Sequence, residues 1–166
     1  MAVLPVGNDT VYELERVRFG GLLQRLTLGP QTYDVPALLR DSFLEALQHR
    51  GYDATIYLPP EASPDATSDG QDFTKPLPEG SPELPFDAAL VSTIDSWYSA
   101  GSGQWKTAMA FEVKLYHVPT AELLYSYKCN CARTADSRGT DSGNLGRRFI
   151  ISCARKSLGS LPVASE

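Results

Sequence analysis

The sequence WKTAMAFEVKLYHVPTAELLYSYKCNC, residues 105 to 131, holds two alternating segments joined by a turn. In the first segment apolar side chains recur at every second position; they are Met109, Phe111, Val113 and Leu115. The run Pro119-Thr120-Ala121-Glu122 is typical of a turn. In the second segment every second side chain again shares one face; these are Leu123, Tyr125, Tyr127, Cys129 and Cys131. Two such segments predict an antiparallel hairpin that is covered on one side only.

Two helices are predicted to provide the cover. DVPALLRDSFLEALQHRG begins at Asp34, a residue type that favours the N-cap, with Pro36 in the first turn, and closes at Gly51. LGRRFIISCARKSLGSL, residues 145 to 161, carries a second apolar stripe and is stopped by Gly159 and Pro162. In both segments the apolar residues repeat with the helical spacing, so each helix is expected to pack one apolar face against the sheet.

The remaining strands complete a mixed sheet. AVLPVGNDT reads as a short strand that ends in a turn at Pro5, Gly7, Asn8 and Asp9. YDATIYL (52 to 58) and FDAALVSTIDSWYS (86 to 99) read as two further strands. The predicted order is strand, helix, strand, long loop, three strands, helix. This is an α+β sandwich, with one mixed sheet of about four to five strands and two main helices on one face.

The chain of 166 residues fits a single domain, 1–166. Residues 59–85 hold seven of the chain's twelve prolines and almost no aliphatic side chains, which indicates a long surface loop or insert. In residues 11–34, apolar positions are broken by Gly20-Gly21 and Gly29-Pro30, which predicts a partly ordered excursion.

SWYSAGSGQW, residues 96 to 105, contains both tryptophans. The glycine-serine run predicts the tip of a hairpin, with Trp97 and Trp105 at opposite strand ends as a cross-strand pair. The alternative is an exposed aromatic surface of Trp97, Tyr98 and Trp105, open to a partner protein, a small ligand or a glycan.

The overall charge restricts the class of partner. Twenty acidic and 15 basic residues give a net charge of −5, and no basic stretch could displace the counterions of a nucleic acid. No apolar run approaches the roughly 20 residues that span a bilayer. No leader with a cleavage site is visible, although the strand-like start at Met1 leaves export open.

No catalytic constellation is apparent. Only two histidines occur, His49 near the end of the first helix and His117 at a strand end, and no GxSxG sequence accompanies them. The glycines of SAGSGQW lack the spacing and the following helix of a phosphate loop, and DSRGTDSGN lacks the ligand spacing of a calcium loop. We therefore expect no enzymatic activity and no cofactor.

The three cysteines are the most distinctive chemical groups. Cys129 and Cys131 share the strand face that the last helix covers, and Cys153 lies on the facing side of that helix. A zinc site would require a fourth ligand and is not expected. Two interpretations remain: three small buried hydrophobes in a reducing compartment, or a disulfide from Cys131 or Cys129 to Cys153 in an oxidising one.

Four segments in order resemble a group of bacterial envelope proteins: AVLPVGNDT, ALLRDSFLEALQHRGYDATIY, FDAALVSTIDSW and VKLYHVPTAELLYSYKCN. The group includes the amino-terminal domain of TolB, the curli-secretion lipoprotein CsgG and the lipoprotein activators of penicillin-binding proteins. This chain departs from the group's hairpin, which usually carries Asp at the position of His117 and Gly at that of Ala121.

The resemblance implies a non-enzymatic accessory protein of the periplasm or outer membrane. Such a protein would act through contacts with envelope proteins in assembly, secretion or polysaccharide export, with homo-oligomers among its expected states. Membrane attachment would come only from a lipid anchor outside this chain. An exported protein also favours the disulfide over three free thiols.

Overall fold

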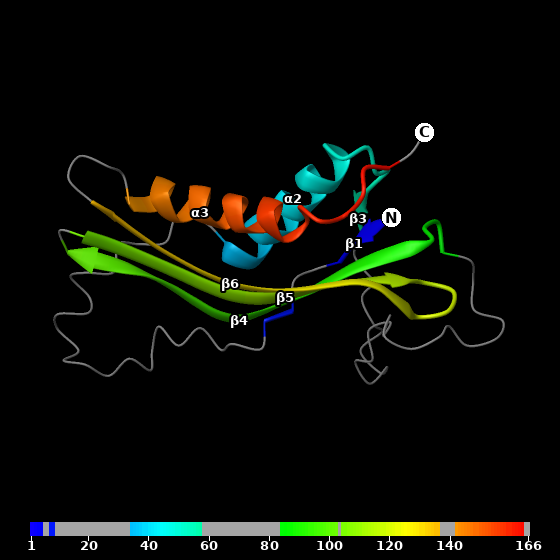
Figure 1. Ribbon diagram of the computed structural model, residues 1–166, viewed down its shortest axis with the longest axis horizontal. Coiled ribbons are helices and arrows are strands. Elements are labelled where there is room, and N and C mark those ends of the chain that lie inside the picture. Colours follow the sequence, from blue (N-terminus) through cyan, green and yellow to red (C-terminus); the bar gives the residue numbers. More distant parts are fainter. Residues whose placement is uncertain (5–6, 9–33, 58–83, 103, 137–141, 165–166) are drawn as a thin grey trace, which may run out of the picture.

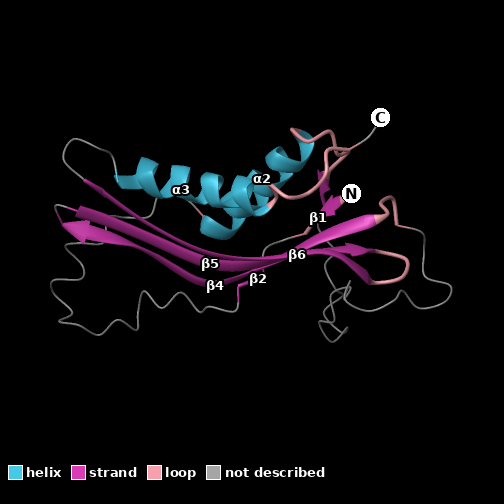
Figure 2. Ribbon diagram, viewed as in Figure 1, coloured by secondary structure: helices cyan, strands magenta, loops and turns pink. Residues whose placement is uncertain are grey.

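The computed structural model describes residues 1–4, 7–8, 34–57, 84–102, 104–136 and 142–164. These residues form two layers, with a long curved sheet below and two helices packed side by side on its upper face (Figure 1). The arrangement confirms the predicted α+β class, the mixed sheet and the placement of both helices on one face (Figure 2).

The sheet runs in the order β3-β1-β4-β5-β6. Its strands are β1 (Ala2–Val3), β3 (Thr55–Ile56), β4 (Ala88–Ser102), β5 (Gln104–His117) and β6 (Glu122–Asp136). The short strand β1 is parallel to both β3 and β4, whereas β4, β5 and β6 form a long antiparallel meander. The parallel pair arises because the chain crosses over through a helix between β1 and β3.

The first strand differs from the prediction. Gly7 and Asn8 do not belong to a turn that ends the strand; they form β2 (Gly7–Asn8), which pairs in parallel with Thr93 and Ile94 of β4. The residues are poor strand formers, and their pairing comes from the neighbouring β4 backbone rather than from local propensity.

The predicted β5–β6 hairpin is confirmed. Phe111 pairs with Cys129 and Met109 with Cys131, so the apolar positions of the two strands share the face beneath the helices. Ala121 closes the turn with a φ of 54°, in the left-handed region that usually holds glycine.

Helix α2 (Val35–Gln48) begins and ends as its sequence predicts. The Asp34 carboxylate accepts a hydrogen bond from the Ala37 N–H at 3.2 Å, and Pro36 occupies the first turn. Beyond the helix, Gly51 takes a φ of +85°, which lets the chain reverse toward β3.

Helix α3 (Ser142–Ser157) begins three residues before the predicted start at 145 and ends before the predicted 161. Its first residues are small and polar, so an apolar periodicity could not reveal them. Leu158 to Leu161 instead form a turn in which the Leu161 N–H donates to the Leu158 carbonyl at 3.1 Å.

The main core lies between the sheet and the two helices. Phe43 of α2 meets Phe111 of β5 edge to face, with ring centroids 5.7 Å apart, and both rings are fully buried. A smaller cluster joins the start of the sheet; it comprises Ala2, Leu4, Phe86, Ala89 and Val118.

Arg50 ties the C-terminal segment to the end of α2. Its guanidinium donates to the carbonyls of Gly159, at 2.8 Å, and Leu161, and its own carbonyl accepts from the Ala164 N–H at 3.0 Å. The Tyr52 hydroxyl donates to the Pro162 carbonyl at 2.8 Å. These bonds hold the segment after α3 against the α2–β3 connection.

Two predictions fall largely outside the described residues. The excursion at 11–34 is described only at Asp34, and the proline-rich loop at 59–85 only from residue 84 onward. Among the helices that the structure describes, none is both long and apolar enough to span a bilayer.

Candidate functional site

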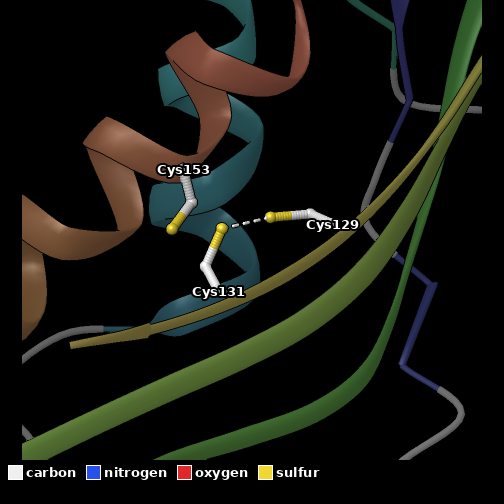
Figure 3. A group of neighbouring side chains, drawn as sticks. All are labelled: Cys129, Cys131 and Cys153. Atoms are coloured by element: carbon white, nitrogen blue, oxygen red, sulfur yellow. Dashed lines mark hydrogen bonds between the residues drawn. The ribbon is translucent and has the colours of Figure 1, made fainter.

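Three cysteines from two elements converge beneath α3. Cys129 and Cys131 lie two residues apart on β6 and therefore point to the same side of the sheet, toward the helices. Cys153 lies on the buried face of α3. The alternation of β6 and the helical stripe of α3 thus bring together the three residues that the sequence singled out (Figure 3).

The three sulfur atoms all lie within 4.8 Å of one another. The Sγ atoms of Cys129 and Cys131 are 2.7 Å apart. In Figure 3 the Cys131 sulfur lies between the other two and faces Cys153. Cys131 is also the only member that is partly exposed, since Cys129 and Cys153 are buried. We call these residues the three-cysteine cluster.

Burial keeps two of the thiols protonated. Removal from water raises the pKa of Cys129 to about 12, and the thiol of Cys131 beside it contributes to that rise in pKa. Burial likewise raises the pKa of Cys153 above its ordinary value, again with a contribution from Cys131. Within the described residues, the cluster therefore favours neutral forms of sulfur, either thiol or disulfide.

A zinc ion does not fit the cluster well. A closed structural zinc site takes four ligands, usually thiolates and imidazoles, and here the described residues bring only three sulfurs together. Three thiolates around one divalent ion would also leave a net negative charge in an apolar core. The cluster is better suited to disulfide chemistry, and the bridge from Cys131 or Cys129 to Cys153 stays a prediction.

The aromatic residues of the hairpin do not share one surface. Trp97 lies on the helix side of β4, half-buried, with its ring centroid 6.4 Å from that of Phe149 in α3. Tyr98, the next residue, points to the opposite face and is 49% exposed. Trp105 pairs through its backbone with Gly101, whereas Trp97 pairs with Met109.

The predicted cross-strand tryptophan pair is therefore wrong. The strands continue beyond Trp97 as far as Ser102 and Gln104, so that the turn is shorter than expected and its centre lies slightly later in the chain. The glycines and serines of SAGSG suggested a turn, but most of them belong to the extended strand β4. The Trp105 side chain lies outside the described part of the structure.

The two histidines have ordinary local partners. His49 Nε2 lies 3.6 Å from a carboxylate oxygen of Glu45, one helical turn earlier. His117 Nδ1 lies 2.9 Å from the Thr120 hydroxyl in the β5–β6 turn. Both contacts lie at the protein surface, one at the end of α2 and the other in the β5–β6 turn.

The β6 strand supplies a feature that the sequence analysis missed. β6 is the last strand in the sheet order, so no strand in the described part of the chain pairs with its outer side. The register shifts between Leu115 and Tyr116, and Leu123 pairs with Tyr116 while Leu124 has no partner position in β5. Leu123 and Leu124 are 50% and 51% exposed. We call this outer side, with the two leucines, the β6 edge.

A signal for this exposure was present in the sequence. Leu123 was expected to face the core together with Tyr125 and Cys129, but a strand cannot bury two consecutive leucines on one face. The pair Leu123-Leu124 therefore indicates either a bulge or an exposed apolar residue, and the structure contains both.

Comparison with known proteins rests on solved structures, because no family model and no curated protein matches the chain. A PelC dodecamer from Paraburkholderia phytofirmans gives a TM-score of 0.54 at 15% identity, covering 99% of this chain and 87% of that chain. Protein XCC0632 from Xanthomonas campestris, of family DUF330, gives 0.56 at 14% identity, covering 95% of this chain and 80% of that chain. The hypothetical protein CT253 from Chlamydia trachomatis gives 0.53 at 14% identity, covering 95% and 92%.

At these identities the likeness concerns the fold alone. The assignment to the TolB, CsgG or penicillin-binding-protein-activator families stays a prediction. The chain shares, over nearly its whole length, the fold of PelC, XCC0632 and CT253.

Proposed function

We propose that this protein is a non-enzymatic accessory protein of the bacterial cell envelope, periplasmic or associated with the outer membrane. In this proposal it acts through protein–protein contacts in envelope assembly, secretion or polysaccharide export. The main support for this proposal is the similarity of the fold to that of PelC over 99% of the chain, together with the dodecameric state of PelC.

Contacts between copies of the chain are part of the proposal. An edge strand presents a row of backbone donors and acceptors that a second chain can pair with. The β6 edge is a strand of 15 residues carrying two half-exposed leucines, and it lies at the end of the described sheet. We propose that this edge contacts a second copy, because a protein of the same fold has been solved as a dodecamer.

The chemistry of the described residues agrees with a non-enzymatic role. The two histidines bond to near neighbours at the surface, and the two buried cysteine thiols are held protonated, which makes them poor nucleophiles. Binding of a glycan by the hairpin aromatics receives less support, since Trp97 packs against Phe149 instead of joining Tyr98.

Cell fractionation tests the proposed location. The complete native gene, with an epitope tag at its C-terminus, would be expressed in its own host and followed in cytosolic, periplasmic and membrane fractions. We expect the protein in the periplasmic or membrane fraction, alongside an envelope marker. Recovery in the cytosol, with the marker correctly fractionated, would contradict the proposal.

A further inference from the structure

We propose that the three-cysteine cluster is a redox modification site that holds one disulfide, between Cys131 and Cys153, and one thiol, at Cys129. The proposal goes beyond the proposed function and does not depend on it, because the oxidant is supplied in the test. The cluster would react with a disulfide oxidant, either a small molecule such as oxidised glutathione or a disulfide-carrying protein.

The positions of the sulfurs favour Cys131 as the shared partner. Its sulfur lies between those of Cys129 and Cys153, and the three are within 4.8 Å (Figure 3). Cys131 is also the member that solvent can reach. An external disulfide would therefore meet Cys131 first.

The choice of Cys153 over Cys129 follows from backbone geometry. Residues two apart on an extended strand have Cα atoms about 6.6 to 6.8 Å apart, at the upper limit of about 6.8 Å for disulfides. A bond between Cys129 and Cys131 would therefore strain β6, although their sulfurs lie 2.7 Å apart. Cys153 approaches from a separate element, α3, whose packing on the sheet leaves its sulfur facing Cys131.

The reaction proceeds in two exchange steps. The Cys131 thiolate attacks a sulfur of the oxidant, which forms a mixed disulfide and expels one thiolate of the oxidant. The Cys153 thiolate then attacks the Cys131 sulfur, forming the internal bond and expelling the second thiolate. Overall, two cysteine thiols lose two electrons and two protons, and the oxidant is reduced to two thiols.

Burial makes the second step the slow one. Because the pKa of Cys153 is raised by burial, only a small fraction of this thiol is ionised near neutral pH. The rate of internal bond formation should therefore rise about tenfold per pH unit, while the mixed disulfide at Cys131 accumulates first.

Peptide mapping of the full chain tests the assignment. Reduced protein would be equilibrated with a mixture of reduced and oxidised glutathione, alkylated, and digested with trypsin. Cleavage after Lys128, Arg133, Arg148 and Arg155 places Cys129 and Cys131 on one peptide and Cys153 on another. Tandem mass spectrometry then shows which cysteine of the first peptide carries the alkyl label.

We expect a cross-linked pair of peptides with the alkyl group on Cys129. Three alkylated cysteines would overturn the proposal, as would a bond between chains or any internal bond that leaves Cys131 or Cys153 free. Retention of one zinc ion per chain with all three cysteines protected from alkylation would also overturn it.

Two alanine variants give an independent measurement. Oxidation should raise the melting temperature of the wild type and of Cys129→Ala by about 6 to 12 °C, because a bridge between residues 131 and 153 closes a loop in the unfolded chain. Cys153→Ala should show a shift below about 2 °C, because it cannot form the bridge. An equal shift in all three proteins would contradict the bridge, and the wild-type mapping decides the question if a variant fails to fold.

Discussion

At the scale of single residues, Ala121 and Arg50 affect the stability in opposite directions. Ala121 holds the β5–β6 turn at a φ of 54°, where a Cβ atom is crowded against the backbone. We predict that Ala121→Gly raises the free energy of unfolding by about 0.5 to 1 kcal/mol. Urea denaturation measures the change.

Ala132→Gly is the matched control for this substitution. Ala132 is exposed on β6, and glycine in the interior of a strand lowers stability by about 0.5 to 1 kcal/mol. If both glycine variants lowered the urea midpoint equally, the strain assigned to Ala121 would be incorrect.

Arg50 supports the C-terminal segment through the carbonyls of Gly159 and Leu161. Hydrogen bonds from a charged donor contribute about 1.5 to 3 kcal/mol each, with overlap when one nitrogen serves both. We predict that Arg50→Ala lowers the free energy of unfolding by about 2 to 3 kcal/mol, measured by urea denaturation.

Arg40→Ala serves as the control for Arg50. The Arg40 guanidinium forms an ion pair with exposed Asp41 at 2.7 Å, and surface pairs contribute about 0 to 1 kcal/mol. A loss at position 50 no larger than that at position 40 would show that the two carbonyl contacts do not hold the segment.

At the scale of elements, the contact between α3 and β6 makes the stability of the reduced protein depend on pH. The thiols of Cys129 and Cys153 have pKa values raised above the ordinary 9.0. In the unfolded chain these thiols ionise near pH 9, while in the folded protein they keep their protons. The two protonated thiols therefore stabilise the fold below pH 9, and this stabilisation is lost as the pH rises toward their pKa values in the folded protein. The loss is at most about 1.4 kcal/mol per pH unit for each thiol.

Urea midpoints at about pH 8 and pH 10, with reductant present, check this prediction. The double variant Cys129→Ala/Cys153→Ala is the control, since it keeps every other titrating group. We predict a larger fall for the wild type than for the double variant. Parallel falls would mean that the two thiols are not buried as the structure has them.

The elements also show how far the sequence could predict the fold. The helix after Asp34 and the β5–β6 hairpin were predictable because each carries its own periodicity and its own cap or turn. The strand β2 and the length of β4 were not predictable, because Gly7, Asn8 and residues 99–102 are extended only through pairing across the sheet.

The candidate site likewise has features that the sequence could predict and features that it could not. The shared face of Cys129 and Cys131 follows from the period of a strand, and the side of Cys153 follows from that of a helix. The order of the sulfurs depends on how α3 lies across β6, which is a property of tertiary packing. Likewise, the separation of Trp97 from Tyr98 depends on which face of β4 the helices cover.

At the scale of the whole molecule, we propose that the protein acts through protein–protein contacts, beginning with its own copies. The β6 edge ends the described sheet, and the same fold occurs in the PelC dodecamer. The double variant Leu123→Lys/Leu124→Lys places two charges on that edge, which opposes strand pairing between chains. Val163→Lys is the control, because Val163 is 72% exposed on the C-terminal segment.

Light scattering coupled to size-exclusion chromatography, over a range of protein concentrations, measures this self-association. We predict that the wild type has the mass of an oligomer, well above the 18.1 kDa of one chain. Val163→Lys should have the same mass as the wild type, and the β6-edge variant a smaller one. A wild-type mass of 18.1 kDa at every concentration would show that copies of the chain do not associate, and an edge variant that assembles like the wild type would show that the β6 edge is not the contact.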